Sequence, residues 1–434
     1  MNKIFSLVFF IFLLSNCSFN KNSSFWSQSK KIISEDNPNR IIKFEEDEAI
    51  SLELNPELEI KLTNQPNENY FENNLDNNNG RVDFNSDLDQ ISKFKFSKIK
   101  DFYKYDPKIS FTNNGIIFFD KKGTIFMFDN QSNLIWSTNI YTKKEMKLNP
   151  VLQLVNNGNV LIVTDSIAKY YSLDLNDGKL IWSKINKAPF NSQIKIQDDN
   201  FFTVDFENTI RSFSIKDGSE NWNVKTDNSL VRSQKKLSIV IVNDVLYFNN
   251  SLGDVTAIDM NEGSLIWQTP TQSSLIYENA FSLKSSDLIA DDKSLYISNN
   301  KNQFFSVDMK TGIVNWENKI NSNLRSTIVE NLIFSISLEG YLIITEKNTG
   351  NIIRVTDIFK GIKEKKRSKI KPIGFVVGLD KIYLTTSNGK LFILDIISGK
   401  TTSILKVDSE QVSRPFISNQ SLYIVKDNAV IKLN

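Results

Sequence analysis

A nine-residue motif that recurs along this chain constrains its fold more than any other feature. The motif begins with Asp, places Gly four positions later and ends with Trp after four more positions. Three copies keep all three residues, at Asp174–Trp182, Asp259–Trp267 and Asp308–Trp316. A unit that returns at near-regular spacing indicates one fold assembled from repeats, because each repeat buries its apolar face only against its neighbours.

Further copies depart from the motif at single positions. Ser214 takes the place of Asp in the copy that ends at Trp222, and the first copy, Asp129–Trp136, is one residue shorter. Two later copies end in Arg354 and Ser403 instead of Trp. The copies end about 40 to 50 residues apart, which is the period of propeller blades with several strands per unit.

Each residue of the motif has a structural role. The Asp side chain accepts hydrogen bonds from backbone N–H groups at the start of a turn, and Gly adopts the positive φ that the turn requires. Trp follows on the outer strand, where its ring fills the gap between neighbouring sheets; the alternative is a platform that stacks a ligand. The repeat residues assigned in this way are Trp136, Trp182, Trp222, Trp267, Trp316, Gly178, Gly218, Gly263 and Gly312.

Runs of β-branched and aromatic residues at period two surround these turns and predict paired strands. Eight inner pairs begin near residues 115, 159, 200, 245, 294, 331, 381 and 421. The last pair, Ser421–Leu433, has no outer strand after it, so we expect Phe94–Ile99 to close the ring, because an open ring leaves sheet edges exposed. The sequence therefore predicts an all-β, eight-bladed β-propeller of four-stranded antiparallel blades over residues 94–434, with seven blades as the alternative.

Composition excludes much chemistry. The 434 residues include no His and one Cys, so no Ser-His-Asp triad, no Cys-His dyad, no His-ligated metal and no intramolecular disulfide can form. The formal net charge is +2, which gives no general attraction to nucleic acid. We therefore predict no catalytic residue, no metal site and no cofactor, and a protein that binds rather than catalyses.

The N-terminus reads as a targeting signal. Met1-Asn2-Lys3 is followed by an apolar run over residues 4–14, which is too short to span a bilayer as a helix. The run ends in Leu-Ser-Asn-Cys, which resembles a bacterial lipoprotein signal. The resemblance implies that residues 1–16 are removed and that Cys17 carries the lipid, including a palmitate-type chain. The alternative is an ordinary signal peptide whose Cys is incidental.

Residues 17–93 lack the repeat and are polar, with acidic and Asn-rich patches. Such composition buries too little apolar surface to offset the entropy of ordering. We expect a lipidated, mostly disordered tether, in which 50–54 and 58–62 are the segments able to dock as strands. A small separate domain is the alternative.

The repeat copies resemble the PQQ-type propeller repeat, to which residues 308–316 are a near match. Two groups share that repeat: the quinoprotein alcohol dehydrogenases and the BamB family of outer-membrane assembly lipoproteins. The signal, the chain length and the eight blades resemble the BamB family. This resemblance implies a non-enzymatic scaffold, anchored at the periplasmic face of the outer membrane of a Gram-negative bacterium, that aids folding and insertion of barrel proteins.

The same resemblance implies partners. In the BamB family, a loop between the third and fourth repeats docks on a POTRA domain of the BamA insertase. The corresponding residues of this chain are Leu230, Val231 and Arg232, which offer a guanidinium among aliphatic side chains. The alternative is that they begin an inner strand of the fourth blade. Other subunits of the assembly machine and unfolded outer-membrane proteins are further expected partners.

Two other functions remain alternatives. A PQQ-dependent periplasmic dehydrogenase shares the repeat, but such enzymes stack the quinone on a disulfide of adjacent cysteines, and this chain has one cysteine. A propeller that binds a sugar or peptide is the second alternative.

Six of the nine residues 363–371 are basic, which indicates either a solvated loop or a contact for an acidic partner or anionic head groups.

Overall fold

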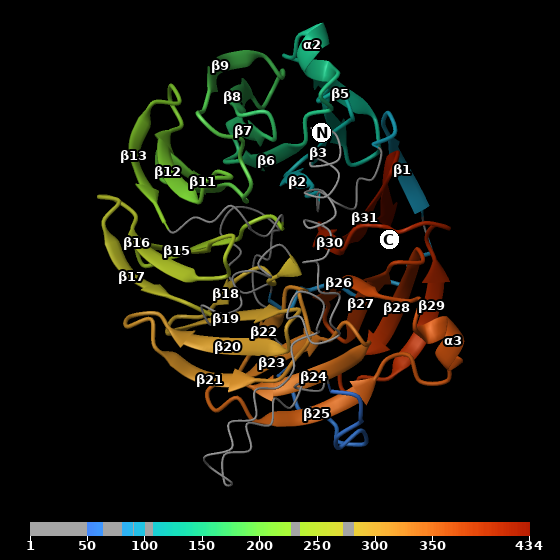
Figure 1. Ribbon diagram of the computed structural model, residues 1–434. Helices are drawn as coiled ribbons and strands as arrows, with labels where there is room; N and C mark the ends of the chain where they lie inside the picture. The colour runs from blue at the N-terminus through green and yellow to red at the C-terminus, as the bar shows by residue number, and fades with distance from the viewer. Residues whose placement is uncertain (1–49, 64–79, 90, 100–106, 227–234, 272–281) are drawn as a thin grey trace, which may run out of the picture. The chain divides into compact units, whose positions relative to one another are not determined.

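The computed structural model describes residues 50–63, 80–89, 91–99, 107–226, 235–271 and 282–434. These residues belong to one compact unit, Asp47–Asn434. They form eight antiparallel sheets of four strands each, arranged around a common axis and following one another in chain order (Figure 1). The eight-bladed propeller predicted from the repeat is thereby confirmed. In the described parts of the chain, no helix is long and apolar enough to cross a membrane.

Blades 1 to 4 contain sixteen strands. They are β2 (Ser110–Thr112), β3 (Gly115–Phe119), β4 (Ile125–Asp129), β5 (Leu134–Thr138), β6 (Leu152–Asn156), β7 (Val160–Asp165), β8 (Lys169–Asp174), β9 (Leu180–Ile185), β10 (Lys195–Gln197), β11 (Asn200–Val204), β12 (Thr209–Ser214), β13 (Glu220–Lys225), β14 (Ile239–Val242), β15 (Val245–Asn249), β16 (Val255–Asp259) and β17 (Leu265–Thr269).

Blades 5 to 7 and three strands of blade 8 follow in the same order. They are β18 (Ile289–Ala290), β19 (Ser294–Asn299), β20 (Gln303–Asp308), β21 (Val314–Asn318), β22 (Thr327–Val329), β23 (Leu332–Ile336), β24 (Tyr341–Glu346), β25 (Ile352–Asp357), β26 (Pro372–Val377), β27 (Lys381–Thr386), β28 (Lys390–Asp395), β29 (Thr401–Lys406), β30 (Pro415–Ser418), β31 (Ser421–Lys426) and β32 (Ala429–Leu433). Two short helices, α2 (Lys143–Met146) and α3 (Glu364–Arg367), lie in connections between blades.

The position of a strand within its blade explains its sequence. The middle strands β7 and β27 are buried on both faces because each blade is covered by two neighbours, so they read as continuous apolar runs. The outermost strands β9 and β13 alternate between exposed and half-buried residues. Trp182 and Trp222 occupy half-buried positions of those strands, which places each ring at the gap to the next blade.

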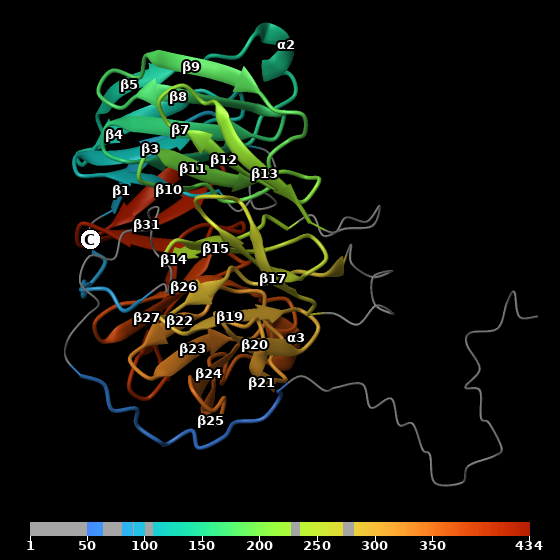
Figure 2. The same cartoon turned by 90° about the vertical axis from the view of Figure 1, so that its left-hand side faces the viewer.

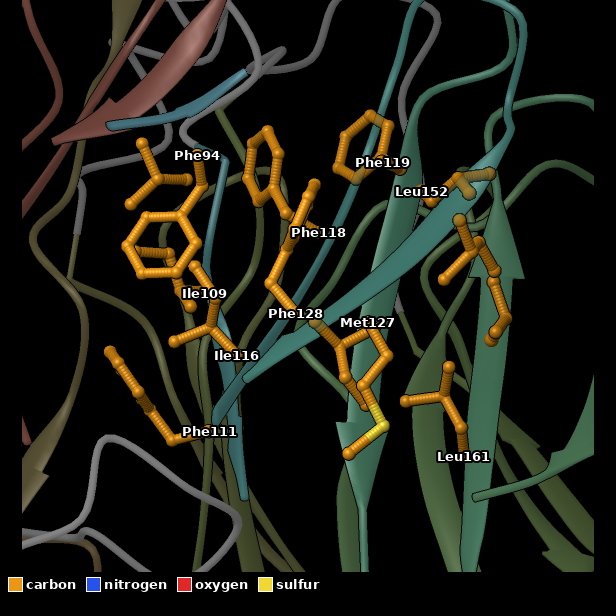
Figure 3. Packing of buried hydrophobic residues seen from close by; sticks show 14 of the residues in the cluster. Phe94, Ile109, Phe111, Ile116, Phe118, Phe119, Met127, Phe128, Leu152 and Leu161 are labelled. Atoms are coloured by element: carbon orange, nitrogen blue, oxygen red, sulfur yellow. The ribbon is translucent and has the colours of Figure 1, made fainter. Parts of the chain in front are cut away.

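Aromatic and aliphatic side chains fill the wedges between blades. Figure 3 shows part of one such cluster, in which Phe111, Phe118 and Phe128 of blade 1 are packed together with residues of blade 2 such as Leu161 on β7. The same cluster includes Phe416 on β30 of blade 8. Each of these five side chains is almost completely buried. Burial of this kind is the main favourable contribution to folding, and it links every blade to the next.

The eighth blade takes its outermost strand from the beginning of the ring. β1 (Ile91–Lys95) pairs antiparallel with β32, and Phe94 lies opposite Val430. The sequence predicted a closing strand at 94–99, whereas the observed strand covers 91–95 and so begins three residues earlier. Beyond the strand, Phe96 and Ile99 donate backbone hydrogen bonds to the turn that joins β31 and β32. The added residues include polar ones such as Ser92 and Lys93, which can pair because the hydrogen bonds between strands involve only backbone groups. The buried Phe94 ring lies 5.6 Å from that of Phe128 in blade 1.

Two parts of the predicted tether are packed on the ring. Residues 50–63, which we call the strap, lie along the rim of blades 6 and 7, and Figure 2 shows them in blue next to β25. Residues 80–89 bury Phe84 against Tyr383 of blade 7, with ring centroids 5.2 Å apart. The two segments expected to be able to dock, 50–54 and 58–62, lie within the strap, where well-spaced apolar side chains such as Ile60 meet the gap between blades. Residues 17–49, 64–79 and 90 lie outside the described residues.

Candidate functional site

The repeat tryptophans join each blade to the next one. Every indole N–H donates a hydrogen bond to a backbone carbonyl that follows the third strand of the neighbouring blade. The five contacts are Trp136 to Leu175 (3.0 Å), Trp182 to Ile215 (2.9 Å), Trp222 to Met260 (3.1 Å), Trp267 to Met309 (2.9 Å) and Trp316 to Lys347 (2.9 Å). The tryptophans therefore lie in packing contacts between blades.

The repeat glycines lie under these rings. Each one faces the Trp of the preceding copy, so Gly178 lies under Trp136 and Gly263 under Trp222. All four assigned glycines have φ between 68° and 73°, and a Cβ on any of them would lie 2.6 to 2.7 Å from a ring atom. A side chain is thus excluded both by the backbone conformation and by the indole.

Arg354 takes the place of Trp in the sixth blade and is completely buried. Its Nη1 donates hydrogen bonds to the carbonyls of Leu58 in the strap, at 2.8 Å, and of Ile397 in blade 7. Gly399 lies under the guanidinium as the other glycines lie under indoles. Burial lowers the pKa of Arg354 to about 10, although Asp395 opposes that shift.

The strap is held by several contacts besides Arg354. Leu54 and Val355 exchange two backbone hydrogen bonds of 3.1 and 2.8 Å, so the strap pairs with the outer edge of β25. The Glu53 carboxylate bonds Lys360 at 2.9 Å, and this contact lowers the Glu53 pKa. Ile60 is buried in the core between blades 6 and 7. These contacts make the strap an integral part of the rim.

The predicted docking residues Leu230, Val231 and Arg232 lie outside the described residues, as does Cys17. The chain leaves the described part of blade 3 at Thr226, whose hydroxyl donates to the Asn208 carbonyl at 3.1 Å. It returns at Lys235, whose ammonium group bonds the carbonyls of Ser285 and Asn323. The end at Thr226 is therefore fixed within blade 3, and the end at Lys235 is fixed to segments that precede blades 5 and 6.

Lys235 belongs to a polar cluster that the sequence analysis missed. Its centre is the buried Asp287, whose Oδ2 accepts a 2.8 Å hydrogen bond from Gln193 Nε2. The ammonium groups of Lys108 and Lys235 lie 3.5 and 3.8 Å from the same carboxylate. These four residues come shortly before the innermost strands β2, β10, β14 and β18, which line the axis of the ring. The cluster is thus assembled from four blades.

Neighbouring cations decide the protonation state of Asp287. Burial alone would raise the pKa of Asp287, but Lys108, Lys235, Arg325 and Arg414 hold it well below the usual range for a carboxyl. Asp287 is therefore ionised at neutral pH and attracts cations from several blades. This arrangement cross-links the inner strands at the axis.

One sequence signal could have revealed the polar cluster. A buried Ser stands directly before several residues of the cluster, and the Oγ of this Ser accepts a hydrogen bond from a backbone N–H on the second strand of the same blade. This serine holds the next side chain at the start of the innermost strand. The three pairs are Ser192-Gln193 with Val204, Ser286-Asp287 with Ser298, and Ser413-Arg414 with Val425. Across the described ranges, no three Cys, Asp or Glu side chains gather as metal ligands.

The fold and the repeat together define a class of protein, the PQQ-type β-propellers, in which the Trp of one blade packs on the Gly of the next. The family profile described as outer membrane protein assembly factor BamB matches residues 121–356, which is more than half of the chain. The chain therefore belongs to the BamB family, as the repeat and the eight blades indicated. No curated protein matches it in sequence.

Solved structures share the fold at low sequence identity. BamB from Moraxella catarrhalis is 17% identical, with a TM-score of 0.63 over 79% of this chain and 100% of that one. The quinohemoprotein alcohol dehydrogenase from Comamonas testosteroni is 8% identical, with a TM-score of 0.58 over 81% of this chain and 78% of that one. The computationally designed Ika8 protein is 12% identical, with a TM-score of 0.57 over 78% and 99% of the two chains. These likenesses show the fold alone.

Proposed function

We propose that this protein is a non-enzymatic scaffold of the outer-membrane β-barrel assembly machinery. It binds the BamA insertase and other subunits, and it aids folding and insertion of barrel proteins. The observation that carries the proposal is the match of the outer membrane protein assembly factor profile across residues 121–356, from the turn before β4 almost to the end of β25. A rigid ring with loops on its surface is suited to hold partners in fixed positions.

The proposed insertase contact is the stretch Leu230, Val231 and Arg232. Its support is the sequence, in which a guanidinium stands beside two aliphatic side chains, a combination enriched in interface hot spots. The fixed positions of Thr226 and Lys235 add support, because a short loop with anchored ends loses less freedom on binding than a free one.

Cys17 is the proposed lipid site, and residues 1–16 are the proposed signal. Together they direct the protein to the periplasmic face of the outer membrane. Several acyl chains on one residue give stable anchoring, since each buried CH2 contributes about 0.8 kcal/mol. If Cys17→Ala protein still fractionates entirely with membranes that have been washed with salt and carbonate, the lipid anchor is incorrect.

The insertase contact is tested by affinity purification from solubilised membranes. We expect the wild-type chain to retain the BamA insertase and Arg232→Glu to lose most of it. Lys216→Glu is the matched control, because Lys216 is an exposed cation in the turn between β12 and β13 of blade 3. Equal recovery of the insertase with both variants would contradict the proposed contact.

The quinoprotein alternative makes a different prediction. It requires the purified protein to bind PQQ with Ca2+ and to reduce a dye in the presence of alcohols. The single cysteine argues against it, because the adjacent-cysteine disulfide that the resemblance implies for such enzymes cannot form. Dye reduction that depends on PQQ would overturn the scaffold proposal.

A further inference from the structure

The connection between blades 6 and 7 carries an exposed cluster of lysines. We call residues 363–371 the basic loop; it contains the four-residue helix α3. Its five lysines are all exposed: Lys363, Lys365, Lys366, Lys369 and Lys371. None of their ammonium groups pairs with a carboxylate in the parts of the chain that the structure describes.

The base of the basic loop is fixed to the ring. Arg367 Nη1 bonds Asp357 Oδ2 at 2.6 Å, and its guanidinium lies 5.1 Å from the centre of the Tyr341 ring. Ile370 is buried in the core between blades 6 and 7. The arginine is thus used within the fold, and the five lysines project from a rigid support.

The first residues of the strap lie beside the base of the basic loop. Tyr341 donates a 2.7 Å hydrogen bond from its hydroxyl to the Ser51 carbonyl, and the Asp357 N–H donates to Glu53 at 3.2 Å. The two residues that hold Arg367 therefore also hold the first described residues of the chain. Ile50 is 33 positions after Cys17, so a covalent connection of at most about 115 Å joins the proposed lipid to this edge of the ring.

We propose that the basic loop is a docking surface for anionic lipid head groups of the membrane that holds the protein. The inference rests on the proposed lipidation of Cys17, because the chain that follows the lipid then joins the ring beside the basic loop. Lysines suit a diffuse anionic surface: an ammonium group is a point charge without the fork geometry that favours a single carboxylate partner. The basic loop also exposes no large apolar side chain of the kind that anchors a protein–protein interface.

The test measures binding to vesicles without the lipid anchor. The mature chain, residues 17–434, carries Cys17→Ser so that no acyl chain can be attached. We expect it to bind vesicles of phosphatidylcholine with about one-third phosphatidylglycerol, and to bind pure phosphatidylcholine vesicles at least about 100-fold more weakly. Binding should weaken as salt screens the charges. Equal binding to both kinds of vesicle would overturn the proposal.

A triple variant assigns the binding to the basic loop. Lys363→Gln, Lys365→Gln and Lys366→Gln together should lower the affinity for anionic vesicles by about 100-fold, at about fivefold per lysine. Unchanged affinity would overturn the proposal.

The matched control removes the same number of charges elsewhere. Helix α2 lies in the connection between blades 1 and 2, and the helix and its C-cap residue together present three exposed lysines. Replacing these by Gln should leave the affinity for vesicles within about twofold of the parent, because the proposal assigns the head-group contact to the basic loop. A loss equal to that of the basic-loop variant would mean that net charge alone is measured, and would overturn the assignment. The control residues are Lys143, Lys144 and Lys147.

Co-purification of the insertase with the same basic-loop variant separates this inference from the proposed function. If the variant keeps the insertase but loses the vesicles, both proposals stand. If it binds vesicles normally and loses the insertase, the basic loop contacts an acidic protein surface and the lipid proposal is wrong. If the parent chain retains the insertase but binds no anionic vesicles, this inference alone fails. If vesicle binding follows the basic loop but the insertase is never recovered, the proposed function alone fails.

Discussion

Arg354 Nη1 donates a 2.8 Å hydrogen bond to the backbone carbonyl of Leu58, 296 positions away in the sequence. Arg354 occupies the place where five other blades carry Trp. An indole has one N–H, which reaches only the next blade, whereas a guanidinium has five and also reaches a second segment. This one departure from the repeat therefore provides a docking point for the strap.

Restoring the repeat at this position should release the strap. In Arg354→Trp, the indole packs on Gly399, and the Leu58 carbonyl loses its charged donor. We expect amide exchange at Leu54 and Ile60 to quicken by about tenfold or more, since a hydrogen bond to a charged group contributes about 1.5–3 kcal/mol. Hydrogen–deuterium exchange measures this. Ser403→Trp in blade 7 is the control and should leave the strap unchanged; unaltered protection in both variants would contradict the assigned role.

Adding a side chain to a repeat glycine should be costly because of the ring above it. Gly263→Ala places a Cβ 2.6 Å from the Trp222 ring at φ 72°, so we expect a loss of about 3 kcal/mol in the free energy of unfolding. Gly158 has φ 93° but no atom within 4 Å of its Cβ position. Gly158→Ala should therefore cost only about 1 kcal/mol, for the backbone alone. Urea unfolding of both variants gives the comparison, and equal losses would show that the indole contact is unimportant.

Ring closure should depend on Phe94. Phe94→Ala removes a buried ring between blades 8 and 1, and we expect a loss of about 3–5 kcal/mol in the free energy of unfolding. Ile91 lies on the same strand but is 62% exposed, so Ile91→Ala should change stability by no more than about 0.5 kcal/mol. Chemical denaturation distinguishes the two. Similar stability for both variants would mean that β1 contributes little to closure.

The polar cluster at the axis predicts a specific pH dependence. The pKa of Asp287 is held far below its usual value, while the unfolded chain has a pKa near 3.9 for this carboxyl. Below about pH 4 the unfolded state binds a proton that the folded state does not, so the free energy of unfolding falls as the pH falls. Asp287→Asn removes this contribution. Its stability should decline less steeply than that of the wild type between about pH 4 and pH 2.

The same variant should be less stable at neutral pH. Removing the Asp287 carboxylate leaves several cations at the axis without their shared counter-charge, which costs about 3 kcal/mol for a buried group. Urea unfolding at a series of pH values measures both effects. Parallel stability curves for the variant and the wild type would contradict the role assigned to Asp287.

Local sequence carried enough information for the architecture of the ring. The copies of the motif predict the turns and the outer strands, because Asp, Gly and Trp have the same local role in every blade. The pairing of each Trp with the Gly of the next copy was not predictable, since a motif shows which residues recur but not which copies touch. The Asp287 cluster was missed for the same reason: its members are dispersed over four blades.

Short-range periodicity and turn chemistry act within one repeat, so the amino-acid sequence was enough to predict eight blades and the place of the repeat residues in each. The positions of the strap and of residues 80–89 depend on tertiary contacts. Their composition is polar, and their stability comes from a few contacts with distant blades, such as Leu58 with Arg354 and Phe84 with Tyr383. Such contacts join segments that are far apart in the sequence, so local patterns do not reveal them.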